Sequence, residues 1–150
     1  MQGPSLRNRI DRFEALCRSR GLPLTIQRRA VFQAVSERDD HPTADQIFEG
    51  VNQRVPGISR TTVYRVLDTL LDLCVVRRVG LTGTPVRFDG TTERHDHVIC
   101  QKCGRVADVE TADLESLPLL EEEPLGFTID EYSMQFIGTC PGCQDRQDGE

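Results

Sequence analysis

The chain has 150 residues, which suits one domain or two small ones. Its net charge is -6 at neutral pH, and no apolar run approaches the roughly 18 residues of a membrane-spanning helix, so we expect no membrane segment. The N-terminus lacks a basic stretch followed by an apolar one, which predicts no secretory signal and a cytoplasmic location. In that compartment disulfides are rare, and paired cysteines are more often metal ligands.

The charge is unevenly distributed along the chain. Residues 1–88 carry 14 basic and 9 acidic residues, a balance of +5, whereas residues 89–150 carry 4 basic and 15 acidic residues, a balance of -11. Every basic residue of the first segment is Arg, whose guanidinium group matches phosphate groups and guanine edges. This pattern favours a nucleic-acid-binding front half, and the alternative is an ordinary solvated charged surface.

Helical periodicity dominates the first 73 residues and predicts four helices. They begin near Leu6, Thr25, Thr43 and Ser59. Thr43 and Gln46 match the capping-box pattern of a helix start. A hairpin is expected next, from Val75–Leu81 and Val86–Phe88 around Gly83. Helices followed by a hairpin predict a winged helix-turn-helix domain over residues 1–88, with a hinge at about residues 84–92.

A second, smaller α/β domain is expected over residues 91–150, so the predicted fold class is α+β. Strands are predicted at Val98–Cys100, at Arg105–Val109 and along Phe127–Ile137, and a short helix at Leu114–Leu120. The two domains divide the chain into a basic helical part and an acidic part that holds most of the candidate metal ligands.

The fourth predicted helix is the natural recognition helix, because its apolar stripe leaves one polar face. That face carries the candidate DNA-binding residues Arg60, Thr61, Thr62, Tyr64 and Arg65. Arginines there can meet phosphate or guanine, and the hydroxyl residues can touch base edges or a thymine methyl. The alternative is an amphipathic helix with a solvated face, but the preceding helices and the following hairpin favour DNA binding.

Two Cys-x2-Cys pairs, Cys100/Cys103 and Cys140/Cys143, predict a four-thiolate zinc site in the second domain. A gap of two residues lets both sulfur atoms of a pair reach one ion, and zinc accepts four thiolates in a closed structural site. Pro141 and Gly142 lie inside the second pair and favour a tight turn there. A thiol redox switch is the competing interpretation of these pairs.

A second, mixed set of candidate ligands comes from histidines and carboxylates. Its members are His41, Asp89, His95, His97 and Asp108. His95 and His97 point the same way in an extended segment, so they can share one ion. Such a nitrogen and oxygen set suits Fe²⁺, Mn²⁺ or Zn²⁺. A hydrolytic metal enzyme is an alternative, but no further acid, base or nucleophile stands out, so we expect no enzyme.

Together these residues resemble the ferric uptake regulator (Fur) family of metal-dependent bacterial repressors, over roughly residues 10–143. The matching stretches are His41–Ala44, Ser59–Arg65, Arg87–Asp89, His95–Gly104 and Cys140–Cys143. The resemblance implies a homodimer that binds a palindromic operator in double-stranded DNA. It also implies structural zinc on the four paired cysteines and a regulatory metal on the mixed set.

Within that family, the chain most resembles the peroxide-sensing branch, PerR, which pairs Asp at the positions of Asp89 and Asp108. Iron-uptake members more often carry Glu at both. Arg94 and Tyr132 stand where a third metal site would need histidines, although Asp96 and Glu115 remain. The branch implies repression with Fe²⁺ or Mn²⁺ and peroxide sensing through iron-catalysed oxidation of His41 or His95. The alternative is an iron- or zinc-uptake regulator without peroxide sensing, and Zn²⁺ can fill the same site in vitro.

Overall fold

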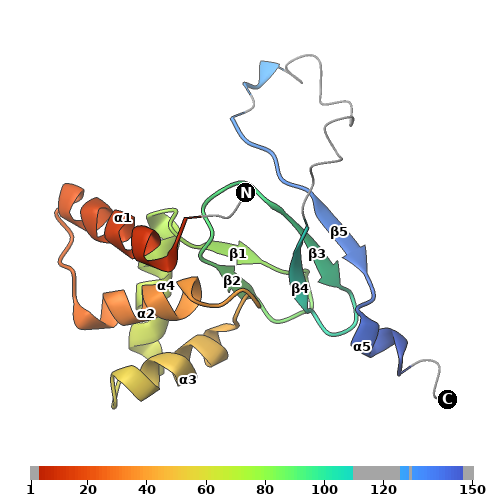
Figure 1. Ribbon diagram of the computed structural model, residues 1–150, viewed down its shortest axis with the longest axis horizontal. Helices are drawn as coiled ribbons and strands as arrows, with labels where there is room; N and C mark the ends of the chain where they lie inside the picture. The colour runs from red at the N-terminus through yellow and green to blue at the C-terminus, as the bar shows by residue number, and fades with distance from the viewer. Residues whose placement is uncertain (1–3, 110–125, 129, 147–150) are drawn as a thin grey trace. The chain divides into compact units, whose positions relative to one another are not determined.

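The computed structural model describes residues 4–109, 126–128 and 130–146 (Figure 1). The chain divides into two compact units, residues 1–93 and 94–150. The helix expected at Leu114–Leu120 lies outside the described residues. None of the described helices has the length and apolarity needed to cross a membrane.

The first unit contains the four expected helices and the hairpin. Its elements are α1 (Leu6–Ser19), α2 (Ile26–Ser36), α3 (Ala44–Arg54), α4 (Arg60–Asp72), β1 (Arg77–Val79) and β2 (Arg87–Asp89). Each helix follows a Ser or Thr whose hydroxyl accepts a backbone N–H of the first turn, which satisfies one of its unpaired donors. The capping box of Thr43 and Gln46 is confirmed, with both of its hydrogen bonds present.

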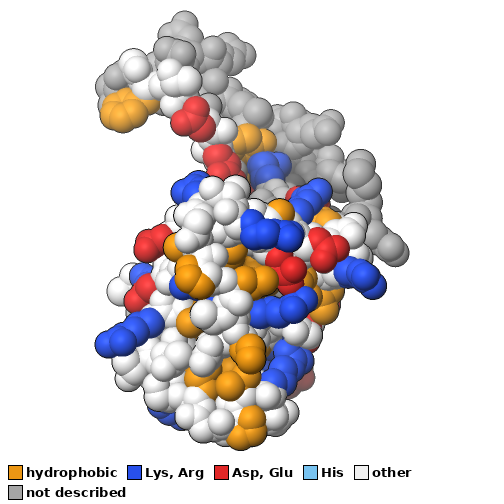
Figure 2. Space-filling view, turned by 90° about the vertical axis from the view of Figure 1, so that its left-hand side faces the viewer, with side chains coloured by type: hydrophobic (Ala, Val, Ile, Leu, Met, Phe, Trp, Pro, Cys, Tyr) orange, Lys and Arg blue, Asp and Glu red, His pale blue; other side chains and the backbone are white. Residues whose placement is uncertain are grey.

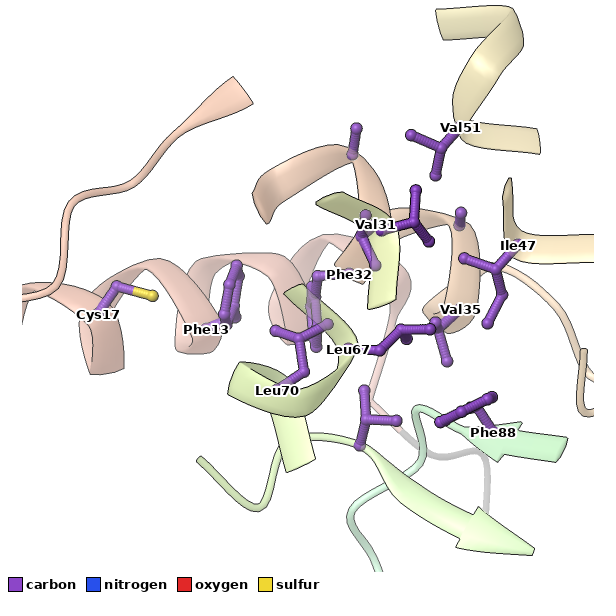
Figure 3. Packing of buried hydrophobic residues seen from close by; sticks show 14 residues of the cluster. Phe13, Cys17, Val31, Phe32, Val35, Ile47, Val51, Leu67, Leu70 and Phe88 are labelled. Atoms are coloured by element: carbon purple, nitrogen blue, oxygen red, sulfur yellow. The ribbon is translucent and has the colours of Figure 1, made fainter. Parts of the chain in front are cut away.

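One hydrophobic cluster joins α1–α4 with the hairpin (Figure 3). The rings of Phe13 and Phe32 stack with centroids 4.3 Å apart and join α1 to α2. Leu67 and Leu70 bury the apolar stripe of α4 in the same cluster. The burial of this stripe fixes the rotation of α4, so its polar face is turned away from the core.

The hairpin, called the wing below, is shorter than expected. Arg78 pairs with Phe88 across its antiparallel strands, and Phe88 is buried in the core of the unit. The prediction that the first strand begins at Val75 is wrong. The Val75 N–H donates to the Leu70 carbonyl, and Cys74 has a φ of 56°, so the chain is still turning away from α4 there.

The second unit contains a three-stranded sheet and one short helix. Its elements are β3 (Asp96–Cys100), β4 (Val106–Val109), β5 (Gln135–Gly138) and α5 (Pro141–Gln144). The strand order is β4-β3-β5, with β3 antiparallel to β4 and parallel to β5. The sheet brings the first cysteine pair, which begins at the last residue of β3, to the second pair, which follows β5.

The prediction of one long strand over Phe127–Ile137 is wrong for residues 130–134, which are described and form no strand. Pairing with β3 starts at Gln135, which lies opposite His97. One residue earlier, the Met134 N–H donates to the Asp96 carboxylate instead of to a strand. The ladder is short because β3 itself begins at Asp96 and offers no earlier backbone partner.

Candidate functional site

The four paired cysteines converge in the second unit. Cys100 ends β3, Cys103 lies in the turn that follows, and Cys140 and Cys143 lie at the start and inside of α5. The turn after β3 is closed by the Gly104 N–H on the Cys100 carbonyl, at 2.9 Å. All four Sγ atoms lie within 4.8 Å of one another, and all the cysteines of the chain are free thiols.

This sulfur cluster fits a tetrahedral zinc ion. Zn–S bonds of about 2.3 Å place tetrahedral sulfur atoms about 3.8 Å apart, and the Sγ atoms of Cys103 and Cys140 are separated by 3.7 Å. Backbone N–H groups, first that of Cys140, lower the pKa of Cys100 to about 6, which favours the thiolate form that binds zinc. Hydrogen bonding to Cys140 and burial raise the pKa of Cys143 to about 12, so zinc must displace a proton there.

In the first unit, His41 and Asp89 form a buried pair. Their side chains are only 3% and 5% exposed, and His41 Nε2 lies 3.6 Å from Asp89 Oδ2. His41 lies between α2 and α3, whereas Asp89 ends β2. The other Asp89 oxygen accepts the Thr91 N–H at 2.8 Å, which orients the carboxylate. The pair therefore offers one nitrogen and one oxygen donor, away from bulk water.

In the second unit, His95, His97 and Asp108 form a second cluster. His97 lies directly opposite Asp108 across β3 and β4. The Nε2 atoms of His95 and His97 approach the same Asp108 oxygen, at 3.4 and 3.5 Å. The two imidazole rings meet edge to face, with centroids 4.4 Å apart. Three donors thus point toward one small volume, as the alternating side chains of an extended segment predict.

Asp96, between the two histidines, faces a different set of groups. Its side chain is fully buried, and Oδ2 lies 3.5 Å from the Arg94 guanidinium. Arg94 also stacks over the Tyr132 ring, 4.0 Å from its centroid. Arg94 and Tyr132, which stand where a third metal site would need histidines, therefore contact each other. Arg94 supplies the positive charge beside Asp96. Glu115 lies outside the described residues.

The polar face of α4 carries the predicted DNA contacts, and two of them already have partners. Arg60 pairs with Asp45 of α3 and lies over the Phe48 ring, 4.4 Å from its centroid. The Thr62 hydroxyl shares a 2.8 Å hydrogen bond with Ser59 at the helix start. The others, Thr61, Tyr64 and Arg65, are exposed. On the face drawn in Figure 2, Lys and Arg side chains are spread out and interspersed with acidic ones.

Residues 19–137 match the sequence model of the ferric uptake regulator family. The chain belongs to this family. It is 30% identical, over 142 residues, to the peroxide-responsive repressor PerR of Staphylococcus aureus strain Mu50, covering 95% of this chain and 96% of that protein. As a family member it is a metal-dependent transcriptional repressor and not an enzyme.

Solved structures agree with this assignment. The Helicobacter pylori ferric uptake regulator superimposes with a TM-score of 0.79 over 96% of this chain and 97% of that one, at 21% identity, which shows the common fold. The Campylobacter jejuni peroxide stress regulator has a TM-score of 0.65 and 28% identity, over 78% of this chain and 88% of that one. The predicted fold class, a helical N-terminal part followed by a small mixed-sheet domain with a four-cysteine cluster, is confirmed.

Proposed function

We propose that this protein is a peroxide-responsive repressor whose binding to operator DNA requires one divalent ion. The ion would be held jointly by the buried pair of the first unit and by the cluster of the second. These ligands are His41, Asp89, His95, His97 and Asp108. The observation that carries the proposal is the convergence of two imidazole Nε2 atoms on one Asp108 oxygen, beside the full-length similarity to a peroxide-responsive repressor.

The donor set favours Fe²⁺ or Mn²⁺ as the regulatory ion. It combines three imidazoles with two carboxylates, which suits these ions better than a soft metal. When bound, Fe²⁺ would supply the redox chemistry that turns peroxide into an oxidant of a nearby ligand. The imidazole of His41 or His95 would then gain one oxygen atom while the peroxide leaves as water. An oxidised imidazole binds metal less well, so the ion and the DNA are released.

The ligands would act as a clamp between the DNA-binding part and the rest of the chain. His41 belongs to the unit that carries α4, whereas His95, His97 and Asp108 belong to the sheet unit. An ion bound by both would select one arrangement of the two, because it binds that arrangement best. In a dimer this arrangement sets the separation of the two α4 helices, and half-sites lie one helical turn, about 34–36 Å, or multiples of it apart.

The sheet unit also offers a surface for the homodimer. Among the described residues, β5 pairs on one side only, with β3. Phe136 and Ile137 are 40% and 61% exposed on that strand. An exposed apolar edge strand is a template for pairing with a second chain. A second copy of this chain would cover the edge and give the two-fold symmetry that a palindromic operator needs.

The sulfur cluster would hold structural zinc and not the regulatory ion. Four thiolates close the coordination of zinc and leave no position for peroxide. The cytoplasmic location stays a prediction that fits reduced cysteines.

The test is DNA binding with Mn²⁺ or Fe²⁺ loaded without oxygen, before and after a peroxide pulse. We expect both metal forms to bind a palindromic A/T-rich operator, and only the Fe²⁺ form to lose binding. Mass spectrometry should then find one added oxygen atom on the His41 or His95 peptide. His41→Ala is the matched variant and should bind DNA weakly with either metal. If both metal forms keep binding after peroxide, the protein is an iron- or zinc-uptake regulator instead.

A further inference from the structure

Strand β2 contacts the segment His41–Thr43 at three successive positions. The Phe88 N–H donates to the Pro42 carbonyl at 2.9 Å, and Thr43 forms an antiparallel bridge with Arg87. Arg87 Nη1 donates to the His41 carbonyl oxygen at 3.1 Å. The segment that enters α3 is therefore attached to the second strand of the wing by both backbone and side chain.

The backbone of His41 adopts a conformation that needs support. Its φ is 55°, in the left-handed region that side chains with a Cβ atom rarely adopt. Pro42 follows and restricts the backbone of His41 further. Such a conformation persists only where the surroundings hold it in place. The Arg87 guanidinium on the His41 carbonyl is one such restraint, and it acts directly on the residue that would bind the metal.

Strand β2 contacts both ends of His41. Arg87 and Asp89 are two residues apart in the strand, so their side chains lie on the same face. The guanidinium binds the His41 carbonyl, while the Asp89 carboxylate oxygen lies 3.6 Å from His41 Nε2. Phe88 points the other way, into the core, and anchors the strand. Strand β2 therefore sets the distance between His41 Nε2 and the Asp89 carboxylate. It does so partly through Arg87, which is not itself a ligand.

We propose that Arg87 is a positioning residue for the regulatory metal. By holding His41 it presents the imidazole beside Asp89, and it links the ligand segment to the wing. The proposal rests on the proposed function, because it concerns the same ion. It assigns no metal contact to Arg87, whose guanidinium has no lone pair to give to a cation.

Charge and positioning predict opposite results for the loss of Arg87. A positive charge beside a cation site repels the ion, so its removal should tighten metal binding if charge alone matters. If Arg87 positions His41, its removal should weaken metal binding. The sign of the change therefore separates the two explanations.

The experiment is a Mn²⁺ titration of the full-length, zinc-loaded protein in the absence of DNA, followed by electron paramagnetic resonance of the free ion. Arg87→Gln should weaken Mn²⁺ binding about tenfold or more, as expected for residues that orient metal ligands. Arg87→Lys keeps a donor and the charge, so its affinity should lie closer to wild type. Arg78→Gln is the matched control, because it removes the same charge from the same hairpin, where Arg78 meets Asp68 at 3.5 Å.

A double-variant cycle tests whether Arg87 acts through His41. In a His41→Ala background the ligand is gone, so Arg87→Gln should cause no further loss of Mn²⁺ affinity. At saturating Mn²⁺, Arg87→Gln should bind DNA as tightly as wild type, which a direct DNA contact would not allow. Circular dichroism checks that each variant folds. If Arg87→Gln does not fold, the cycle is run with Arg87→Lys, for which a smaller loss of Mn²⁺ affinity is expected.

Each remaining outcome has one meaning. Unchanged or tighter Mn²⁺ binding by Arg87→Gln overturns the inference, as does an equal loss in Arg78→Gln or an undiminished loss in the His41→Ala background. If wild type binds no Mn²⁺, or His41→Ala binds it as well as wild type does, the proposed function itself fails. The two failures are therefore distinguishable.

Discussion

Removing zinc from the four-cysteine site should unfold the sheet of the second unit and leave the helices of the first unit folded. The first cysteine pair begins at the last residue of β3 and the second pair follows β5, so the ion would tie together the ends of two parallel neighbours. Parallel strands need a long connection, and here residues 101–134 lie between β3 and β5 in the sequence. Bound zinc would link the ends of the two strands directly, without that long connection.

The expected size of the effect follows from the burial in this unit. Among its described residues, the buried aliphatic side chains are Ile99 and Val106. Each contributes about 1.5–3 kcal/mol, or about 3–6 kcal/mol together. A structural zinc site contributes about 10–16 kcal/mol of apparent binding free energy. The zinc term is the larger, so the sheet should depend on the ion more than on these side chains.

Hydrogen exchange can measure the effect of zinc removal on each unit separately. After chelation, the amides of β3 and β4 should lose protection, whereas those of α4, whose Leu67 and Leu70 lie in the core of the first unit, should keep it. Cys143→Ser should reproduce the loss, and Cys17→Ser, which changes a buried cysteine of the first unit, should not. Continued protection of Ile99 after complete zinc removal would refute the reasoning. Paired cysteines that react with a thiol reagent before chelation would favour a redox switch.

Three further changes separate DNA contacts from structural roles. Arg65→Ala should lower DNA affinity and reduce the slope of log affinity against log salt concentration by about 1, without changing the melting temperature. An unchanged slope would show that Arg65 does not contact DNA. Arg60→Ala should also lower stability, by about 0.5–1 kcal/mol in urea unfolding, because its guanidinium lies over Phe48 and pairs with α3; full stability would show these contacts to be weak. Arg94→Ala should cost about 1–3 kcal/mol, because it leaves the buried Asp96 carboxylate without its cation; a neutral result would mean that water replaces the guanidinium.

The helical part of the fold was predictable because its signals are local. The starts of α1–α4 each carry a hydroxyl side chain that caps the first turn, and each of these helices has one apolar stripe. Both signals are contained in the short stretch of sequence that forms the helix, so neither depends on distant residues. The cysteine cluster was predictable for a related reason, since zinc chemistry limits which spacings can share an ion.

The sheet of the second unit was predicted less well, because strand limits depend on partners far away in sequence. Phe127 to Met134 alternates like a strand, but β3 offers a backbone partner only from Asp96 onward. In the same way, the sequence places Arg60 and Thr62 on a polar helix face without revealing that Asp45 and Ser59 engage them. The Arg60–Asp45 contact joins two separate helices, so no local pattern in the sequence predicts it.

Strand β3 links the two candidate metal sites of the second unit. It begins beside His95, carries His97, and ends at Cys100, so one short strand supplies ligands to both clusters. The alternation of side chains turns His95 and His97 to one face, while Asp96 turns to the other and receives the Met134 N–H at the entrance to β5. Asp108 reaches the histidines only because β4 pairs with β3. A sheet that needs zinc to fold would therefore also need zinc to assemble these regulatory ligands, and Mn²⁺ or Fe²⁺ should bind only after the four-cysteine site is filled.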